Sequence, residues 1–169
     1  MRKILIVLLS MPIIASAQLR AGLDVYRSIS LGPVEEKADD LALTIGYEKM
    51  LPLGFVGVGG EYTLDIAEDG LNMVYLYGVG KIPIMPFMRG IVRAGYSMPM
   101  GDGADMYEPG MSYGVGARFK LPLIPIGLEA LYTMHSLEMK DTGDEFADAF
   151  ADLLDFKLNA LNVTATLKF

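Results

Sequence analysis

Residues 162–169 read NVTATLKF, and apolar and polar side chains alternate along them. An alternation of period two is typical of a β-strand whose two faces meet different surroundings. One face of this segment carries four apolar residues, Val163, Ala165, Leu167 and Phe169. The chain is therefore expected to end in a strand that lies between an apolar medium and a polar one.

The same alternation recurs in seven earlier segments of the chain. These segments are 19–26, 41–48, 56–64, 71–79, 88–96, 111–119 and 126–134. Together with residues 161–169 they predict eight strands of roughly nine to eleven residues, the length that a tilted strand needs to cross a bilayer.

Short and long connections alternate between the expected strands. Three short ones carry a Lys followed by a Pro with apolar neighbours, at 49–53, 81–84 and 120–123, and we expect a tight turn at each. Four longer polar connections lie at about 30–40, 66–70, 98–110 and 135–155. This pattern predicts an all-β fold, an eight-stranded antiparallel up-and-down barrel with both ends of the chain on the turn side.

Composition excludes several classes of protein. The chain has 169 residues, of which 52% are hydrophobic, no Cys and a net charge of −7. The length fits one domain. The lack of Cys excludes disulfides and thiol chemistry, and the acidic charge argues against a nucleic-acid partner. Beyond residue 17 no stretch of 18 uncharged apolar residues occurs, so the usual pattern of a transmembrane helix is missing.

Residues 1–17 have the pattern of a secretory signal peptide. A cationic start at residues 1–3 precedes an apolar run at 4–14, and Ala15-Ser16-Ala17 fits the small-residue cleavage pattern. We expect cleavage before Gln18, which leaves one barrel domain at 18–169 outside the cytoplasm. A short N-terminal anchor is the alternative, but the apolar run is too short to span a bilayer.

Alternation alone does not decide whether the apolar face points into a lipid-carrying lumen or out into a membrane. Glycines are frequent on the more polar face, which suits the narrow lumen of an eight-stranded barrel. Aromatic residues gather near strand ends, as in the interfacial girdles of membrane barrels. Both observations favour an apolar face in contact with lipid.

The signal peptide, the eight strands and the terminal Phe169 together resemble the small outer-membrane β-barrels of the OmpX and OmpA-transmembrane-domain type. The resemblance covers the mature chain and implies a location in outer-membrane lipid, and we expect a monomer. It also implies that the last strand, ending at Phe169, is the insertion signal read by the barrel-assembly machinery.

Eight charged residues are expected to point into the lumen. The four cationic ones are Arg20, Arg89, Arg93 and Arg118, and the four anionic ones are Asp24, Glu48, Glu61 and Glu129. Unpaired charges are costly in a narrow lumen, so we expect a paired network that closes it. The alternative is a narrow channel for ions or small hydrophobic molecules, which the apolar residues Val74, Leu76, Ile91 and Leu131, expected on the same face, would favour.

The expected long loops, together with Asp65 directly before the second, carry 17 of the 21 acidic residues. An acidic outer rim is expected to include Glu35, Glu36, Asp39, Asp40, Asp102, Asp105, Glu108, Asp141, Asp144 and Glu145. Three roles are open for such a rim: it is solvated and nothing more, it shares divalent cations with lipopolysaccharide, or it recruits a basic partner. The Lys residues expected at the opposite, turn side are Lys49, Lys81, Lys120 and Lys168.

Two further expectations concern the fourth loop and enzymatic activity. A capping box at 142–145 followed by apolar residues at helical spacing predicts a short amphipathic helix over 144–154. His135 and Ser136 are adjacent on one strand and so point to opposite faces, which is poor geometry for a base and its nucleophile. We therefore expect no enzyme, no cofactor and no dedicated metal site, with a lipid A-modifying enzyme as the remaining alternative.

Overall fold

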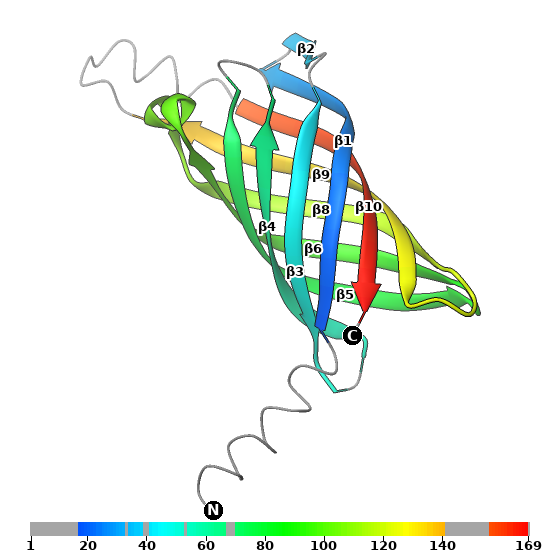
Figure 1. The fold of residues 1–169 in the computed structure, drawn as a ribbon. Coiled ribbons are helices and arrows are strands. Elements are labelled where there is room, and N and C mark those ends of the chain that lie inside the picture. Colours follow the sequence, from blue (N-terminus) through cyan, green and yellow to red (C-terminus); the bar gives the residue numbers. More distant parts are fainter. Residues whose placement is uncertain are drawn as a thin grey trace, which may run out of the picture.

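The computed structural model describes residues 17–32, 34–38, 41–52, 54–66, 70–140 and 156–168. Within these ranges, one closed antiparallel barrel is formed (Figure 1). Its wall strands are β1 (Ala17–Leu31), β3 (Ala42–Met50), β4 (Val56–Asp65), β5 (Asn72–Met85), β6 (Met88–Met100), β8 (Gly110–Lys120), β9 (Ile126–Met139) and β10 (Phe156–Lys168). Each strand pairs with the next in this order, and β10 closes the barrel against β1. The predicted eight-stranded up-and-down barrel is confirmed.

Two of the loops carry short additional elements. In the first loop, β2 (Val34–Ala38) pairs with the end of β1 and extends that hairpin beyond the barrel wall. In the third loop, a short 3-10 helix η1 (Asp102–Met106) leads into β7 (Tyr107–Glu108), which pairs with the end of β9. Among the described residues, no helix is long and apolar enough to cross a membrane.

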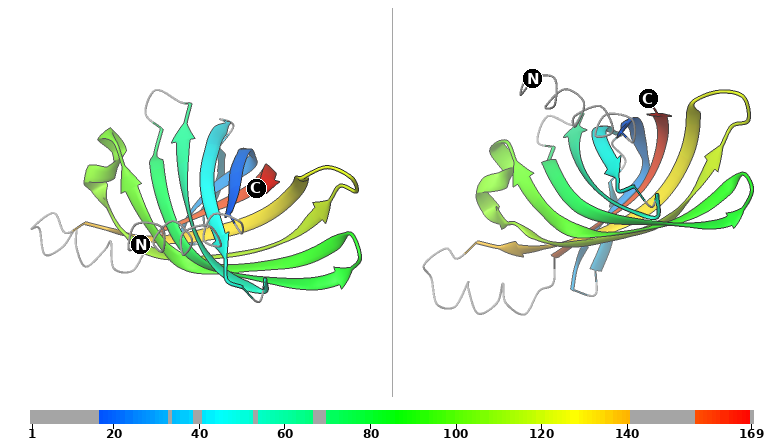
Figure 2. Two further views of the ribbon diagram at one scale, coloured as in Figure 1. Left: turned by 60° about the horizontal axis from the view of Figure 1, so that its bottom comes forward. Right: turned by 90° about the horizontal axis from the view of Figure 1, so that it is seen from below.

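The strands are staggered as they go round the barrel (Figure 2). Following cross-strand partners from Gln18 through every wall strand returns to β1 at Ile29, eleven residues further on. One of the eleven is Val25, the extra residue of a bulge between Asp24 and Tyr26. Such a stagger requires strands tilted by about 40° from the barrel axis.

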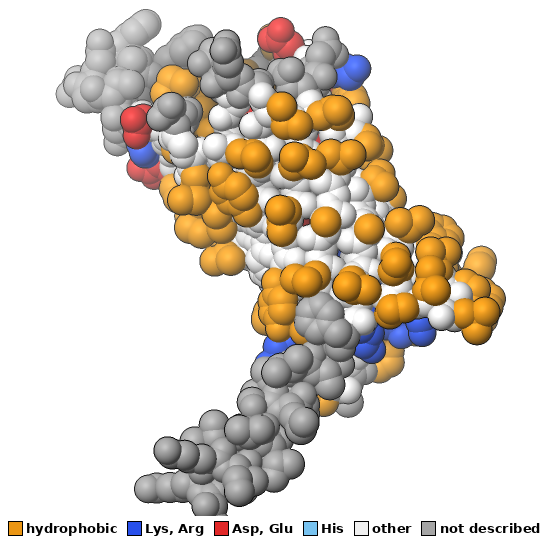
Figure 3. Space-filling view, viewed as in Figure 1, with side chains coloured by type: hydrophobic (Ala, Val, Ile, Leu, Met, Phe, Trp, Pro, Cys, Tyr) orange, Lys and Arg blue, Asp and Glu red, His pale blue; other side chains and the backbone are white. Residues whose placement is uncertain are grey.

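The outer surface of the wall is apolar. Side chains such as Leu43, Ile45, Val58 and Val115 are exposed on alternate positions of their strands, while the residues between them face the lumen. In Figure 3, apolar side chains are spread over the visible wall with backbone and other side chains between them, acidic side chains lie at the loop end, and cationic side chains lie at both ends. The apolar face therefore points outward, as expected for a barrel that lies in lipid.

The assignment of faces on β5 was wrong. Tyr75, Tyr77 and Val79 are 2–4% exposed and point into the lumen, whereas Leu76 is 51% exposed and points outward. Val74, expected in the lumen with Leu76, has the same outward parity. Both faces of β5 are apolar, so alternation does not distinguish them. Only Ile91 and Leu131 of the four expected apolar lining residues are buried inside the barrel.

The second short turn also lies later than predicted. Strand β5 continues through residues 81–84 and turns at Pro86 and Phe87, because Met85 pairs with Met88. Lys81 is consequently a strand residue with a buried side chain, 1% exposed, rather than a turn residue. The other two short connections lie close to their predicted positions, after Met50 and after Lys120.

Three expectations fall outside the described residues. They are the signal peptide expected at 1–17, of which only Ala17 is described, the helix over 144–154 and the terminal Phe169. Ala17, the last residue of the expected signal peptide, is the first residue of β1 and pairs with Lys49.

Candidate functional site in the barrel lumen

Six buried charges from six different strands meet at the middle of the lumen. We call them the charge cluster: Arg20, Glu48, Glu61, Lys81, Arg93 and Glu129. Three are cationic and three anionic, and none is more than 9% exposed. The cluster is therefore neutral as a whole, which is the condition for keeping charges away from water.

Glu129 has the largest number of cationic partners in the cluster. Its carboxylate lies 3.1 Å from the Lys81 ammonium and 3.2 Å from Arg93, and it also accepts a hydrogen bond from Arg20. Arg118 lies 3.5 Å away on the turn side of the cluster. Four strands are thus tied to β9 through one side chain.

Glu61 connects two arginines to a tyrosine. It accepts hydrogen bonds from Arg20 at 2.6 Å, from Arg93 at 2.7 Å and from the Tyr77 hydroxyl at 3.1 Å. The Arg93 guanidinium also lies over the Tyr77 ring, 4.3 Å from its centroid, in a cation–π contact. Tyr77 therefore holds both partners of an ion pair in place.

Glu48 completes the cluster on the opposite wall. It lies 2.5 Å from the Lys81 ammonium, 3.2 Å from Arg93 and 3.8 Å from Arg20. Lys81 bridges Glu48 and Glu129 and supplies the third cation of the cluster. Without it, the six-residue cluster would hold one more carboxylate than cations.

A second ion pair lies nearer the loop end. Arg27 hydrogen-bonds to Asp65 and lies 4.0 Å from Asp24, whose carboxylate accepts a 2.7 Å hydrogen bond from Asn162. Arg27 reaches the interior because the bulge at Val25 reverses the parity of β1 beyond it. Asp24 is therefore lumenal, as expected, but it is separate from the charge cluster.

A histidine and two serines form a further polar layer. The Ser97 hydroxyl lies 2.7 Å from Nδ1 of His135, and the Ser112 hydroxyl lies 2.9 Å from the same atom and 2.7 Å from Ser97. Tyr75 meets the His135 ring edge to face, with centroids 5.4 Å apart. All four residues are buried. His135 is thus engaged by serines of other strands, and not by Ser136.

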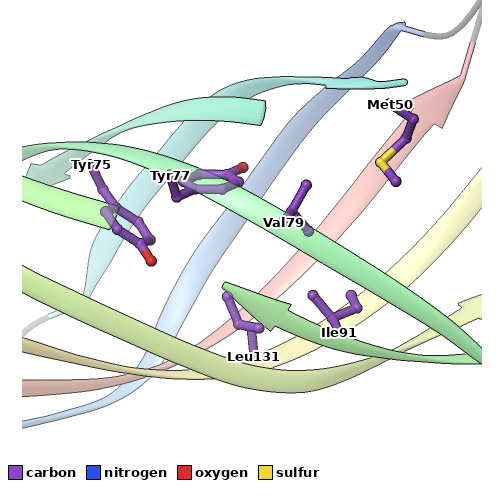
Figure 4. Packing of buried hydrophobic residues seen from close by; sticks show 6 residues of the cluster. All are labelled: Met50, Tyr75, Tyr77, Val79, Ile91 and Leu131. Carbon is purple, nitrogen blue, oxygen red and sulfur yellow. The ribbon is translucent and has the colours of Figure 1, made fainter. Parts of the chain in front are cut away.

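Apolar side chains pack together at the loop end of the lumen. Met73, Leu137, Phe156 and Leu158 form a buried cluster at the loop end, and Tyr107 of the third loop stacks on Phe156 with ring centroids 4.5 Å apart. A second apolar group is formed by side chains of four strands that point into the lumen, as Figure 4 shows: Met50, Tyr75, Tyr77, Val79, Ile91 and Leu131. Between the layers, the cavity next to His135 measures about 20 Å³, space for about one water molecule.

The turn end of the lumen is open instead. A cavity of about 720 Å³ lies there, which we call the turn-end vestibule. Its walls come from all three short turns and from the ends of β1 and β10. Gln18 and Arg118, joined by a hydrogen bond, line the vestibule on the side of the charge cluster.

The structure brings together five of the eight charges expected in the lumen and leaves three apart. Arg20, Glu48, Glu61, Arg93 and Glu129 belong to the charge cluster; Arg118 borders it, Asp24 belongs to the second ion pair, and Arg89 has an exposed side chain at the vestibule. The parity of its strand predicts a lumenal Arg89. It lies next to the turn, however, where parity no longer implies burial.

The described part of the acidic rim lies at the loop end. Glu35 and Glu36 are exposed on β2, and Asp105 and Glu108 are exposed in the third loop, where Asp102 begins η1. The remaining expected members lie outside the described residues: Asp39, Asp40, Asp141, Asp144 and Glu145. Within the described ranges, no group of three or more His, Asp or Glu side chains is placed to hold a metal ion.

A closed, tilted, eight-stranded antiparallel wall with an apolar outside and a charged inside defines the small transmembrane β-barrels. The fold matches a de novo designed transmembrane β-barrel, with a TM-score of 0.58, 11% identity and coverage of 91% of this chain and 96% of that one.

It also matches two natural proteins of known structure. For Neisserial surface protein A the TM-score is 0.61 at 11% identity, covering 91% of this chain and 97% of that one. For Ail, the attachment invasion locus protein of Yersinia pestis, the TM-score is 0.54 at 15% identity, covering 90% of this chain and 97% of that one. Neither a protein-family profile nor a curated protein sequence matches the chain. These likenesses establish the fold.

Proposed function

We propose that the chain is a small outer-membrane barrel that conducts nothing through its lumen and serves the envelope through its outer surface and acidic loops. The observation that carries this proposal is the charge cluster. Its six side chains form ion pairs with one another across the lumen, and an apolar layer that includes Phe156 and Leu158 lies on its loop side. A permeant ion would have to disrupt both layers.

Planar-bilayer conductance of the purified protein tests closure. We expect no steady channel from the wild-type protein. The double variant Glu48→Ala/Arg93→Ala removes one anion and one cation, so the cluster stays neutral while a gap opens at its centre. We expect this variant to pass ions. The control Lys49→Ala, on the neighbouring but outward position of β3, should stay closed. Steady wild-type channels would instead support the narrow-channel alternative.

An enzymatic role has little support in the lumen. The only His of the chain, His135, is 6% exposed, and its Nδ1 is held by Ser97 and Ser112 beneath the apolar layer. The cavity beside His135 measures about 20 Å³, which is too small for an acyl chain. Mass spectrometry of lipid A from cells with and without the protein tests the point, and a changed acylation pattern would contradict a purely structural role.

The acidic rim is the part of the molecule that we propose to act at the cell surface. Its exposed carboxylates Glu35, Glu36, Asp105 and Glu108 lie at the end opposite to the cationic turn end. We propose that they share divalent cations with anionic lipopolysaccharide. Neutralising these four residues to Gln or Asn should raise the uptake of a hydrophobic dye by intact cells to the level of cells lacking the protein. Unchanged uptake would count against this role.

A further inference from the structure

The turn-end vestibule has the size and walls of a ligand site. Its volume of about 720 Å³ falls in the range of pockets that hold small molecules, about 300–1,000 Å³. Unlike the rest of the lumen, it is not filled by side chains. It lies at the end of the barrel away from the acidic rim, so it is separate from the surface to which the proposed function is assigned.

The described charged residues that line the vestibule are all cationic. The charged residues that line it are Arg89, Arg118, Lys120 and Lys168, and no Asp or Glu is among the described lining residues. Arg118 shares its charge with Glu129, whereas Arg89 and Lys120 have no ion-pair partner within the described part of the chain. Cations gathered on concave walls attract and concentrate an anion.

The remaining wall of the vestibule is apolar. It is lined by Met50, Leu51, Phe87, Leu123 and Ile124, and a proline from each of the three turns also lines the cavity. Leu123 is fully exposed and is the only described residue other than glycine with a positive φ, 74°. A leucine in this conformation costs about 1–2 kcal/mol. The turn therefore holds an apolar side chain out at the rim at an energetic cost.

We propose that the turn-end vestibule binds a single-chain anionic lipid, with its carboxylate or phosphate headgroup on Arg89 and Lys120 and its acyl chain against Leu51, Phe87 and Leu123. A purely polar anion would leave the apolar wall in water, and a neutral lipid would leave the cations unpaired. An anion joined to one acyl chain satisfies both walls. This inference goes beyond the proposed function, because it concerns the end of the barrel opposite to the acidic loops.

Native mass spectrometry of the folded protein in octyl glucoside tests the inference. The probes are lysophosphatidylglycerol and oleate as anionic single-chain lipids, and lysophosphatidylcholine as the zwitterionic control. We expect a saturable 1:1 complex with at least one anionic lipid and none with the zwitterionic one at the same concentration. Binding of both anionic lipids indicates a site for any single-chain anion; binding of one alone identifies the headgroup as phosphate or carboxylate.

Matched variants locate the complex. Arg89→Gln/Lys120→Gln should weaken anionic-lipid binding at least tenfold, while Lys49→Gln, at the same end but outside the vestibule, should leave it unchanged. The mobility of unheated protein on gels verifies that each variant is folded. Equal binding of the zwitterionic lipid, displacement by inorganic phosphate alone, or equal weakening by Lys49→Gln would overturn the proposal.

Discussion

Replacing Glu129 by Gln should destabilise the barrel severely. The substitution keeps the shape of the side chain and removes only its charge, which three cluster cations and Arg118 face. Breaking a buried ion pair on one side typically costs about 3–5 kcal/mol. Because Glu129 is buried and has partners on four strands, we expect a loss of about 3 kcal/mol or more in the free energy of unfolding.

A second substitution isolates the electrostatic part of this loss. Lys81→Met removes the cation that lies 3.1 Å from Glu129 and should destabilise by a similar amount when made alone. At that distance, with an effective dielectric constant of about 20, the attraction is about 5 kcal/mol. The double variant restores neutrality in the cluster. It should therefore be less unstable than the sum of the two single variants by about 1–3 kcal/mol.

Urea unfolding in phosphatidylcholine vesicles measures these energies, with the folded fraction read from the mobility of unheated samples on gels. Lys49→Met is the control, since it makes the same change on the outward side of β3 and should shift the unfolding free energy by less than about 1 kcal/mol. A loss below about 1 kcal/mol for Glu129→Gln, or additive effects of the two cluster substitutions within about 0.5 kcal/mol, would refute the reasoning. Either result would mean that water screens the cluster.

Three further substitutions test the wall, the lumen and a turn by the same unfolding assay. Gly95→Ala should destabilise by about 1–3 kcal/mol, because the new methyl group would overlap the carbonyl oxygen of Leu76, whereas Gly78→Ala, with 3.8 Å to its nearest neighbour, should be tolerated. Tyr77→Phe removes a 3.1 Å hydrogen bond to a cluster carboxylate and should cost about 1.5–3 kcal/mol. Leu123→Gly should stabilise by about 1 kcal/mol, because glycine adopts a positive φ without strain. An unchanged urea midpoint of unfolding for Gly95→Ala, Tyr77→Phe or Leu123→Gly would contradict the reasoning for that residue.

Period-two alternation predicts the strands and, for most of them, which side points into the lumen. It works wherever one face is apolar and the other is small or charged, as on β3 around Glu48 and on β9 around Glu129. It fails on β5, where Tyr75 and Tyr77 are as apolar as the residues between them. Lys81 lies on the same face of β5 as both tyrosines. Its charge is the feature of the sequence that indicates that this face points into the lumen.

Other parts of the lumen depend on register, which the sequence does not encode locally. The bulge at Val25 turns Arg27 inward, where it meets Asp65, a residue that the alternation places only at the edge of the second loop. His135 meets Ser112 because β8 and β9 pair in one particular register, and Ser97 joins them from β6. Neither spacing nor composition points to these partners. They become visible only when the strands are aligned.

The charge cluster also constrains the order in which the barrel assembles. Arg20 lies on the first wall strand and its partner Glu129 lies 109 residues later, so the pair forms only when the sheet has curled round. An inserted but unclosed sheet would lack this pair, although Arg20 keeps Glu61 within reach across β3. A cation left facing hydrocarbon at the bilayer midplane costs about 2–4 kcal/mol. We therefore expect crossing of the bilayer and joining of the first strand to the last to be coupled.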